Sequence, residues 1–156
     1  MNIRTLLTTM ALAGLLAGVT APVQAALPSA GNQRILSRDG ACEITVPAGW
    51  KLDKWDKNDA GAPDKSISAS IESPRPHFTL AQVKPIVEGS LKPVKVFEDS
   101  SQRLWYHYQF DQYGAGTHWY IGVPRKGGIC AATIIFKNAA QTDLAKQIVM
   151  SVKPAP

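Results

Sequence analysis

The sequence predicts a mixed α+β domain, and three kinds of pattern support this. Several short segments alternate apolar and polar residues, as half-buried strands do. Two segments place a capping residue three positions before a glutamine, which is how many helices begin. The two cysteines each fall inside a strand pattern, far apart in the chain. These patterns together indicate a sheet that packs against helices around one core.

The first 25 residues read as an export signal. Arg4 supplies the positive start, residues 10–19 are uncharged and apolar, and residues 23–25 end in the small-x-small pattern that signal peptidase cuts. The apolar stretch is shorter than the ~20 residues that a bilayer-spanning helix needs. Cys42 lies too far into the chain to carry a lipid directly after the signal. We therefore expect a periplasmic or secreted protein without a stable membrane anchor.

The remaining chain has the length of one domain. Residues 26–33 form a flexible lead-in of small and turn-forming residues, and residues 34–153 form the domain itself. The formal net charge of +5 falls by one with the loss of Arg4, and the other basic residues are spread without a cluster. Nucleic-acid binding concentrates basic residues on one face, so we expect no nucleic-acid partner.

The two cysteines of an exported domain favour a disulfide over a zinc site, which usually needs four closely spaced ligands. Cys42 and Cys130 each lie on the apolar side of an alternating strand, so both are expected to point into the same core. A Cys42–Cys130 disulfide is the prediction, and two buried free thiols are the alternative.

Turn and cap residues divide the first half of the domain into elements. The predicted order starts with a hairpin over 34–37 and 41–46 and a solvated loop over 50–65 with alternating lysines and aspartates. A half-exposed strand over 66–73 follows. The next elements are a helix from the cap Thr79 to about 91, which Pro85 is expected to shorten or kink, and a strand around 94–98.

Residues 103–111 and 116–124 predict an aromatic hairpin joined by the loop 112–115. If this four-residue loop sets the register, the core face pairs Tyr108 with Trp119, Tyr106 with Ile121 and Leu104 with Val123. The opposite face then carries a set of aromatic and imidazole side chains: Trp105, His107, His118 and Tyr120.

These four residues are the predicted binding patch, because large amphipathic rings provide contact area at low entropic cost. The alternative is that a helix or loop of the same domain covers them.

The last elements are a nearly continuous apolar strand over 128–137, expected in the middle of the sheet, and a final helix. Asn138 with Gln141 caps this helix, and apolar residues recur every four positions from 140 to 152. The helix is expected to cover the sheet.

The sequence carries no nucleophile motif of the Gly-x-Ser-x-Gly or Ser-x-x-Lys kind. A calcium loop starting at Asp56 fails, because Ala60 and Ile67 occupy positions that need oxygen ligands. His107 and His118 would be diagonal neighbours on the hairpin but lack a third ligand. We expect neither a metal nor a cofactor.

The segment Cys42–Trp50 reads as a strand that runs into a Val-Pro-Ala-Gly-Trp turn. A loop, a serine-rich strand, a helix, further strands and a terminal helix ending Ile-Val-Met-Ser-Val at 148–152 follow it. In this order the chain resembles PsbP-like domains, which include the DcrB-like envelope proteins. The resemblance implies an antiparallel sheet flanked by helices, and a binding scaffold rather than an enzyme.

The sequence thus favours a non-catalytic domain that binds another protein of the cell envelope, as an envelope accessory factor or an immunity-type inhibitor does. Contact through one sheet face or through the 50–65 loop is expected. The alternative is a small-ligand-binding or hydrolytic periplasmic protein, with its site between the sheet and this loop.

Overall fold

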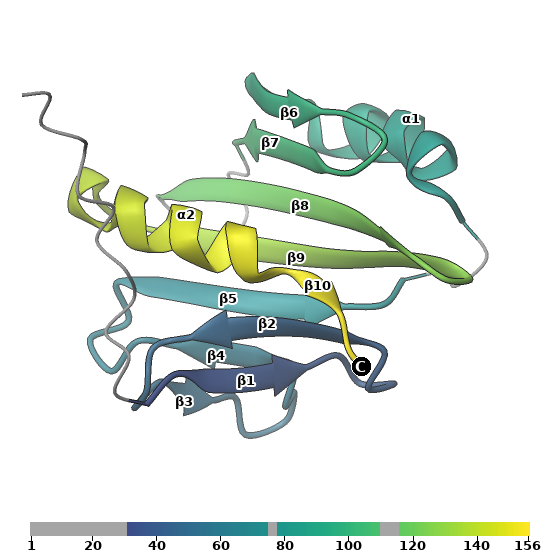
Figure 1. The fold of residues 1–156 in the computed structure, drawn as a ribbon. Helices are drawn as coiled ribbons and strands as arrows, with labels where there is room; N and C mark the ends of the chain where they lie inside the picture. The colour runs from purple at the N-terminus through teal and green to yellow at the C-terminus, as the bar shows by residue number, and fades with distance from the viewer. Residues whose placement is uncertain (1–30, 75–77, 110–115) are drawn as a thin grey trace, which may run out of the picture.

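The computed structural model describes residues 31–74, 78–109 and 116–156 (Figure 1). The export signal, most of the lead-in, His77 and the loop 112–115 lie outside these residues. The strands are β1 (Gln33–Leu36), β2 (Cys42–Val46), β3 (Lys51–Leu52), β4 (Asp59–Gly61), β5 (Ile67–Glu72), β6 (Lys95–Asp99), β7 (Leu104–Tyr108), β8 (Thr117–Arg125), β9 (Gly128–Phe136) and β10 (Lys153–Pro154). The helices are α1 (Leu80–Leu91) and α2 (Thr142–Ser151), the second preceded by the 3-10 turn η2 (Ala139–Gln141).

The strands form two antiparallel sheets. The larger sheet has the order β3-β4-β5-β9-β8-β7-β6, and the smaller has the order β1-β2-β10. β9 lies at the centre of the larger sheet, as its continuous apolar pattern predicted. The α+β class with an antiparallel sheet flanked by helices is confirmed. The separation of the first hairpin into its own small sheet was not predicted.

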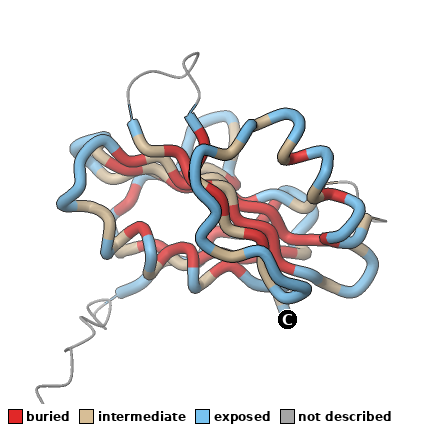
Figure 2. Tube along the Cα trace, turned by 90° about the horizontal axis from the view of Figure 1, so that it is seen from above, coloured by how far each residue is buried: buried red, intermediate tan, exposed pale blue. Residues whose placement is uncertain are grey.

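The larger sheet divides the apolar interior into two cores. On one face, α2 and the small sheet cover the larger core, in which Ile44, Ile134 and Ile148 are fully buried. On the other face, α1 covers a smaller core around Val83, Tyr106 and Ile129. Figure 2 shows the buried residues running along the central strands, with exposed residues toward the periphery. This layering follows from the alternation of side chains along each strand.

The disulfide joins the two sheets. Cys42 of β2 and Cys130 of β9 are bonded and fully buried in the larger core, so the predicted pairing is confirmed. It ties the small sheet to the central strand of the large one.

The capping residues place α1 as predicted. Thr79 accepts a hydrogen bond from the backbone of Gln82, whose side chain accepts one from the backbone N–H of Thr79 (2.9 Å). This reciprocal pair is a capping box. Pro85 does not shorten the helix, which continues for twelve residues and ends where Lys92 turns left-handed, at φ 49°. α2 begins later than expected, because Asn138 caps the η2 turn rather than the helix itself.

The segment 50–65 is more ordered than the predicted solvated loop. Trp50 is buried in the larger core, and the short strands β3 and β4 extend the sheet beyond β5. The expectation of a plain loop is therefore wrong. The alternating charges of this segment masked its pairing, because charged residues are common on edge strands.

The predicted register of the β7–β8 hairpin is also wrong, by one residue. Tyr106 lies opposite Tyr120 and Trp105 lies opposite Ile121, where the prediction paired Tyr106 with Ile121. A slip of one residue moves one strand's side chains to the other face relative to its neighbour. Hydrophobic alternation could not choose the register, because helices or strands cover both faces here and both carry aromatic residues.

Candidate functional site

The four residues of the predicted binding patch do not share a face. Trp105 and His107 lie on the α2 side of the sheet, whereas His118 and Tyr120 lie on the α1 side. His107 and His118 are therefore not diagonal neighbours on one face, and the geometry considered for a shared metal ion is absent. The cause is the one-residue register difference in the hairpin.

The two residues on the α1 side are largely covered by the domain itself. His118 is 1% exposed, which contradicts its expected place on an outward face. Tyr120 packs against the smaller core. Its burial, followed by the charge of Glu72 and by Tyr106, raises the pKa of Tyr120. For these two side chains, internal packing accounts for the aromatic pattern.

The other two residues belong to a small aromatic surface that the sequence prediction missed in part. The ring of Phe97 in β6 stacks on Trp105 at 4.6 Å and meets the edge of Trp119 at 5.3 Å. The ammonium of Lys95 lies 4.8 Å from the Phe97 ring. Phe97 remains 36% exposed at the edge of the sheet. Its alternation with Lys95 was the signal that could have assigned it to the same face as Trp105.

A more exposed aromatic residue lies in the β3–β4 hairpin. Trp55 is 84% exposed, the highest value among the exposed large hydrophobic residues, and Leu52 beside it is 41% exposed. The ammonium of Lys54 lies 4.7 Å from the Trp55 ring. Single exposed apolar residues are ordinary on protein surfaces. What distinguishes Trp55 is that the backbone beneath it is fixed.

Asp53 organises the hairpin tip. Its carboxylate accepts hydrogen bonds from the backbone N–H groups of Trp55 (2.8 Å) and Asp56 (3.0 Å). These bonds hold the pKa of Asp53 below its ordinary value, so the carboxylate stays ionised. Asp56 in turn pairs with Arg38 of the β1–β2 turn at 3.0 Å. The chain therefore presents Trp55 on a preorganised loop, which lowers the entropic cost of using it in a contact.

A buried asparagine attaches the same hairpin to the sheet. The amide nitrogen of Asn58 donates to the carbonyl of Ile71 (3.0 Å), and the backbone N–H of Ile71 donates to the carbonyl of Asn58 (3.0 Å). These two hydrogen bonds thus attach the hairpin that carries Trp55 to β5.

Beside Trp55, a groove of about 460 Å³ lies between the hairpin and the sheet. It occupies the place that the sequence predicted for a small-ligand site. Its polar lining residues are Lys51, Lys54, Lys65, Asp53, Asp59, Ser68, Ser70 and Thr133. None of these three lysines makes an ion pair with another described residue.

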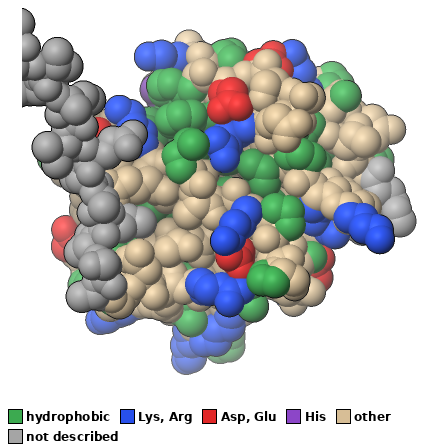
Figure 3. Space-filling view, viewed as in Figure 1, with side chains coloured by type: hydrophobic (Ala, Val, Ile, Leu, Met, Phe, Trp, Pro, Cys, Tyr) green, Lys and Arg blue, Asp and Glu red, His purple; other side chains and the backbone are tan. Residues whose placement is uncertain are grey.

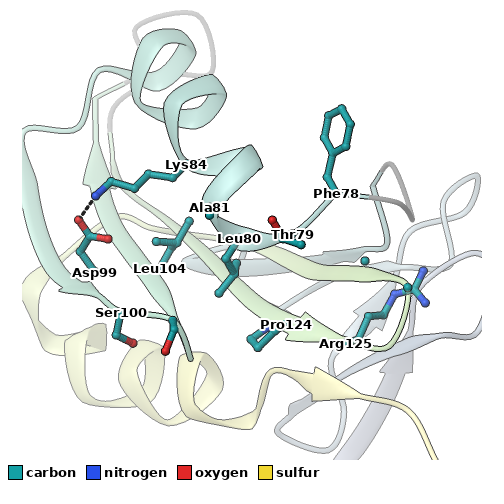
Figure 4. A pocket seen from close by; sticks show the side chains of 13 residues that line it. Phe78, Thr79, Leu80, Ala81, Lys84, Asp99, Ser100, Leu104, Pro124 and Arg125 are labelled. Atoms are coloured by element: carbon teal, nitrogen blue, oxygen red, sulfur yellow. Dashed lines mark hydrogen bonds and ion pairs between the residues drawn. The ribbon is translucent and has the colours of Figure 1, made fainter.

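Another groove, of about 620 Å³, lies at the start of α1 (Figure 4). Leu80, Leu104 and Pro124 give it an apolar lining, and Lys84 beside it is paired with Asp99. Arg125 turns away from the groove and donates to Ser73 at 2.7 Å. The charged groups at this groove are thus engaged within the domain, unlike the lysines beside Trp55.

Basic side chains are spread over the molecule. Figure 3 shows lysine and arginine side chains at several separate places on one face, with some at the lower edge, where β3 and β4 lie in Figure 1. This distribution agrees with the diffuse basic charge of the sequence. None of the described helices is both long enough and apolar enough to cross a membrane.

Comparisons with known proteins show a likeness in structure but not in sequence. No protein-family model matches the chain, and no curated protein matches its sequence. The chain is similar to the solution structure of cyanobacterial PsbP (CyanoP) from Synechocystis sp. PCC 6803, with 14% sequence identity and a TM-score of 0.42. The match covers 90% of this chain and 98% of that one.

Proposed function

We propose that this protein is a non-catalytic binding domain of the cell envelope or of the secreted fraction, and that it contacts a partner protein through the β3–β4 hairpin. The single observation that carries the proposal is Trp55, a large side chain that is 84% exposed on a loop fixed by hydrogen bonds. Residues that dominate binding energy at protein interfaces are enriched in tryptophan, tyrosine and arginine.

The cellular location is part of the proposal. The export signal read from residues 1–25 supports it, and so does the buried disulfide, since disulfides persist in oxidising compartments. The sequence carries no nucleophile motif, which supports a role in binding rather than in catalysis.

Site-specific crosslinking followed by affinity measurement tests this proposal. A photo-reactive residue at position 55, in protein expressed in its own envelope, should capture a defined partner, and the same residue at the exposed position of Val94 should not. With the purified partner, Trp55→Ala should weaken binding by at least about 2 kcal/mol, or roughly thirtyfold.

The matched control is Val94→Ala, which truncates another exposed apolar side chain, just before the strand β6 at the far edge of the sheet. It should leave both affinity and thermal stability unchanged. Because Trp55 has few contacts to lose, Trp55→Ala should also melt at the temperature of the unmodified protein. Binding of Trp55→Ala within twofold of the unmodified protein would refute the role of the hairpin.

A second surface can be tested by the same crosslinking experiment. Trp105 and His107, two of the residues predicted from the sequence, are half-buried at this edge of the sheet: Trp105 stacks on Phe97, and His107 lies opposite Lys95. Crosslinking from position 97 would show whether a partner extends along this edge.

The alternative function is the binding of a small ligand in the 460 Å³ groove beside the hairpin. Its three lysines form no ion pair with a described residue and outnumber its two aspartates, Asp53 and Asp59, which favours an anionic ligand. Native mass spectrometry of protein purified from its own envelope would detect such a ligand as a discrete mass increment. Lys51→Gln with Lys65→Gln should remove that increment.

A further inference from the structure

A second pocket lies on the other side of the hairpin tip. It has a volume of about 450 Å³ and is formed where the β1–β2 turn, the hairpin and the end of β5 meet. Apart from Pro74, the residues that line it have polar side chains: Arg38, Asp39, Asp56, Asn58, Glu72 and Ser73. Residues of the same hairpin therefore line both the 460 Å³ groove and this pocket.

The pocket carries an excess of negative charge. Three carboxylates line it, against the single guanidinium of Arg38, whose side chain is 82% exposed and bonded to Asp56. Asp39 also faces Arg125, at 3.7 Å, whereas Glu72 forms no ion pair with a described residue. Even with Arg125 counted, the carboxylates outnumber the cations among the described residues at this pocket. Hydrogen bonds, that from Ser37 first, hold the pKa of Asp39 below its ordinary value, so this carboxylate is ionised at neutral pH.

Asn58, which also lines the pocket, carries an unused hydrogen-bond acceptor. Asn58 is 7% exposed, and its amide nitrogen is bonded to Ile71, which fixes the orientation of the side chain. Its Oδ1 is buried and accepts no hydrogen bond. A buried carbonyl oxygen without a donor is costly, so a group that supplies an N–H there gains more than an ordinary surface hydrogen bond.

The arrangement suits an organic cation better than a metal ion. Among the described residues, no three Asp, Glu, His or Cys side chains are close enough together to hold a metal. A guanidinium is planar and presents five N–H donors, so it can meet separated carboxylates and an amide oxygen at once. Arg38 already shows that Asp56 accepts a guanidinium here.

From these observations we infer that the pocket receives an arginine side chain of the partner protein, next to the contact that Trp55 makes. This inference rests on the proposed function, because it assigns the basic residue to the same partner. The partner is thus expected to present an apolar group and an arginine side by side, the first against Trp55 and the second between Asp56 and Glu72.

The test uses the isolated amino-acid side chain as a probe. The ¹⁵N-labelled full protein is titrated with Nα-acetyl-arginine amide, and with the isosteric uncharged Nα-acetyl-citrulline amide as the control. The arginine compound should give saturable shifts of the Asn58 side-chain amide and the Ser73 backbone amide. The citrulline compound should give none.

Glu72→Gln tests the charge. Glu72 is exposed at the end of β5, so the substitution should not disturb folding, and it should weaken binding of the arginine compound by about tenfold. Lys51→Gln, on the other side of the hairpin, should leave that binding unchanged.

Three results would overturn the inference. They are the absence of saturable shifts, equal binding of the citrulline compound, and saturable shifts with calcium chloride that the arginine compound does not compete away. The proposed function is tested separately, because Trp55→Ala should leave binding of the arginine compound intact. If Trp55→Ala loses the partner but the unmodified protein does not bind the arginine compound, this inference alone is wrong.

Discussion

Removal of the Cys42–Cys130 disulfide should cost a large share of the stability of the domain. The two cysteines are 88 residues apart in the sequence. Closing a loop of that length restricts the unfolded chain by an entropy that corresponds to about 4.6 kcal/mol at 25 °C. Small domains are stable by only about 5–15 kcal/mol in total, so the reduced protein should be close to unfolding.

Urea denaturation of the Cys42→Ala, Cys130→Ala double variant measures this effect. With a urea dependence of about 1.5 kcal/mol per molar, the midpoint should fall by about 3 M relative to the oxidised protein. Unmodified protein kept reduced throughout should show a similar fall, which separates the cross-link from the lost sulfur atoms. The reasoning is refuted if oxidised and reduced proteins unfold at the same urea concentration, or if the native protein has the mass of two free thiols.

Three further predictions concern single side chains. Burial raises the pKa of Glu43, but hydrogen bonds and charges from Lys153 and Arg34 outweigh burial, so the pKa lies below the ordinary 4.5. The stability that Glu43 contributes is therefore fully present above about pH 4.5 and is lost as the pH falls through the pKa of Glu43 in the folded protein. Glu43→Gln should flatten the acid side of a plot of urea midpoint against pH. Thr79→Ala removes half of the capping box of α1 and should lower the free energy of unfolding, measured in urea, by about 1 kcal/mol. An unchanged free energy of unfolding would contradict the role of the cap. Burial, followed by Asp99 and Glu88, raises the pKa of Tyr106 to about 12, so stability should decline as pH rises from 10 toward 12. Tyr106→Phe should remove a step of tyrosinate absorbance near pH 12, and ionisation of Tyr106 near pH 10 would contradict this.

The elements with local signals were predicted well from the sequence. Thr79 and Gln82 marked the start of α1, and the apolar run over 128–137 marked the central strand. Cys42 and Cys130 could be paired because each alternates with apolar neighbours that face one core. In each of these cases, a few neighbouring residues contain the physical cause of the structure.

The hairpin register and the candidate site depended on the whole fold instead. Tyr106 and Trp105 are both large and aromatic, so the strand itself does not show which of them faces α2. The sequence indicated the 50–65 segment as a contact region but not Trp55. Its exposure depends on Asp53, which bonds two backbone N–H groups, and on Asn58, which anchors the hairpin to β5.

The division of the interior by the large sheet also has a dynamic consequence. α1 buries only three of its own side chains, and these lie in the smaller of the two cores. The β3–β4 hairpin is instead attached to β5, which contributes side chains to the larger core that also holds the disulfide. Detachment of this helix is thus a subglobal opening that costs less free energy than global unfolding. Amide protons of α1 should exchange with solvent before those of β9, while the surface around Trp55 keeps its native shape throughout.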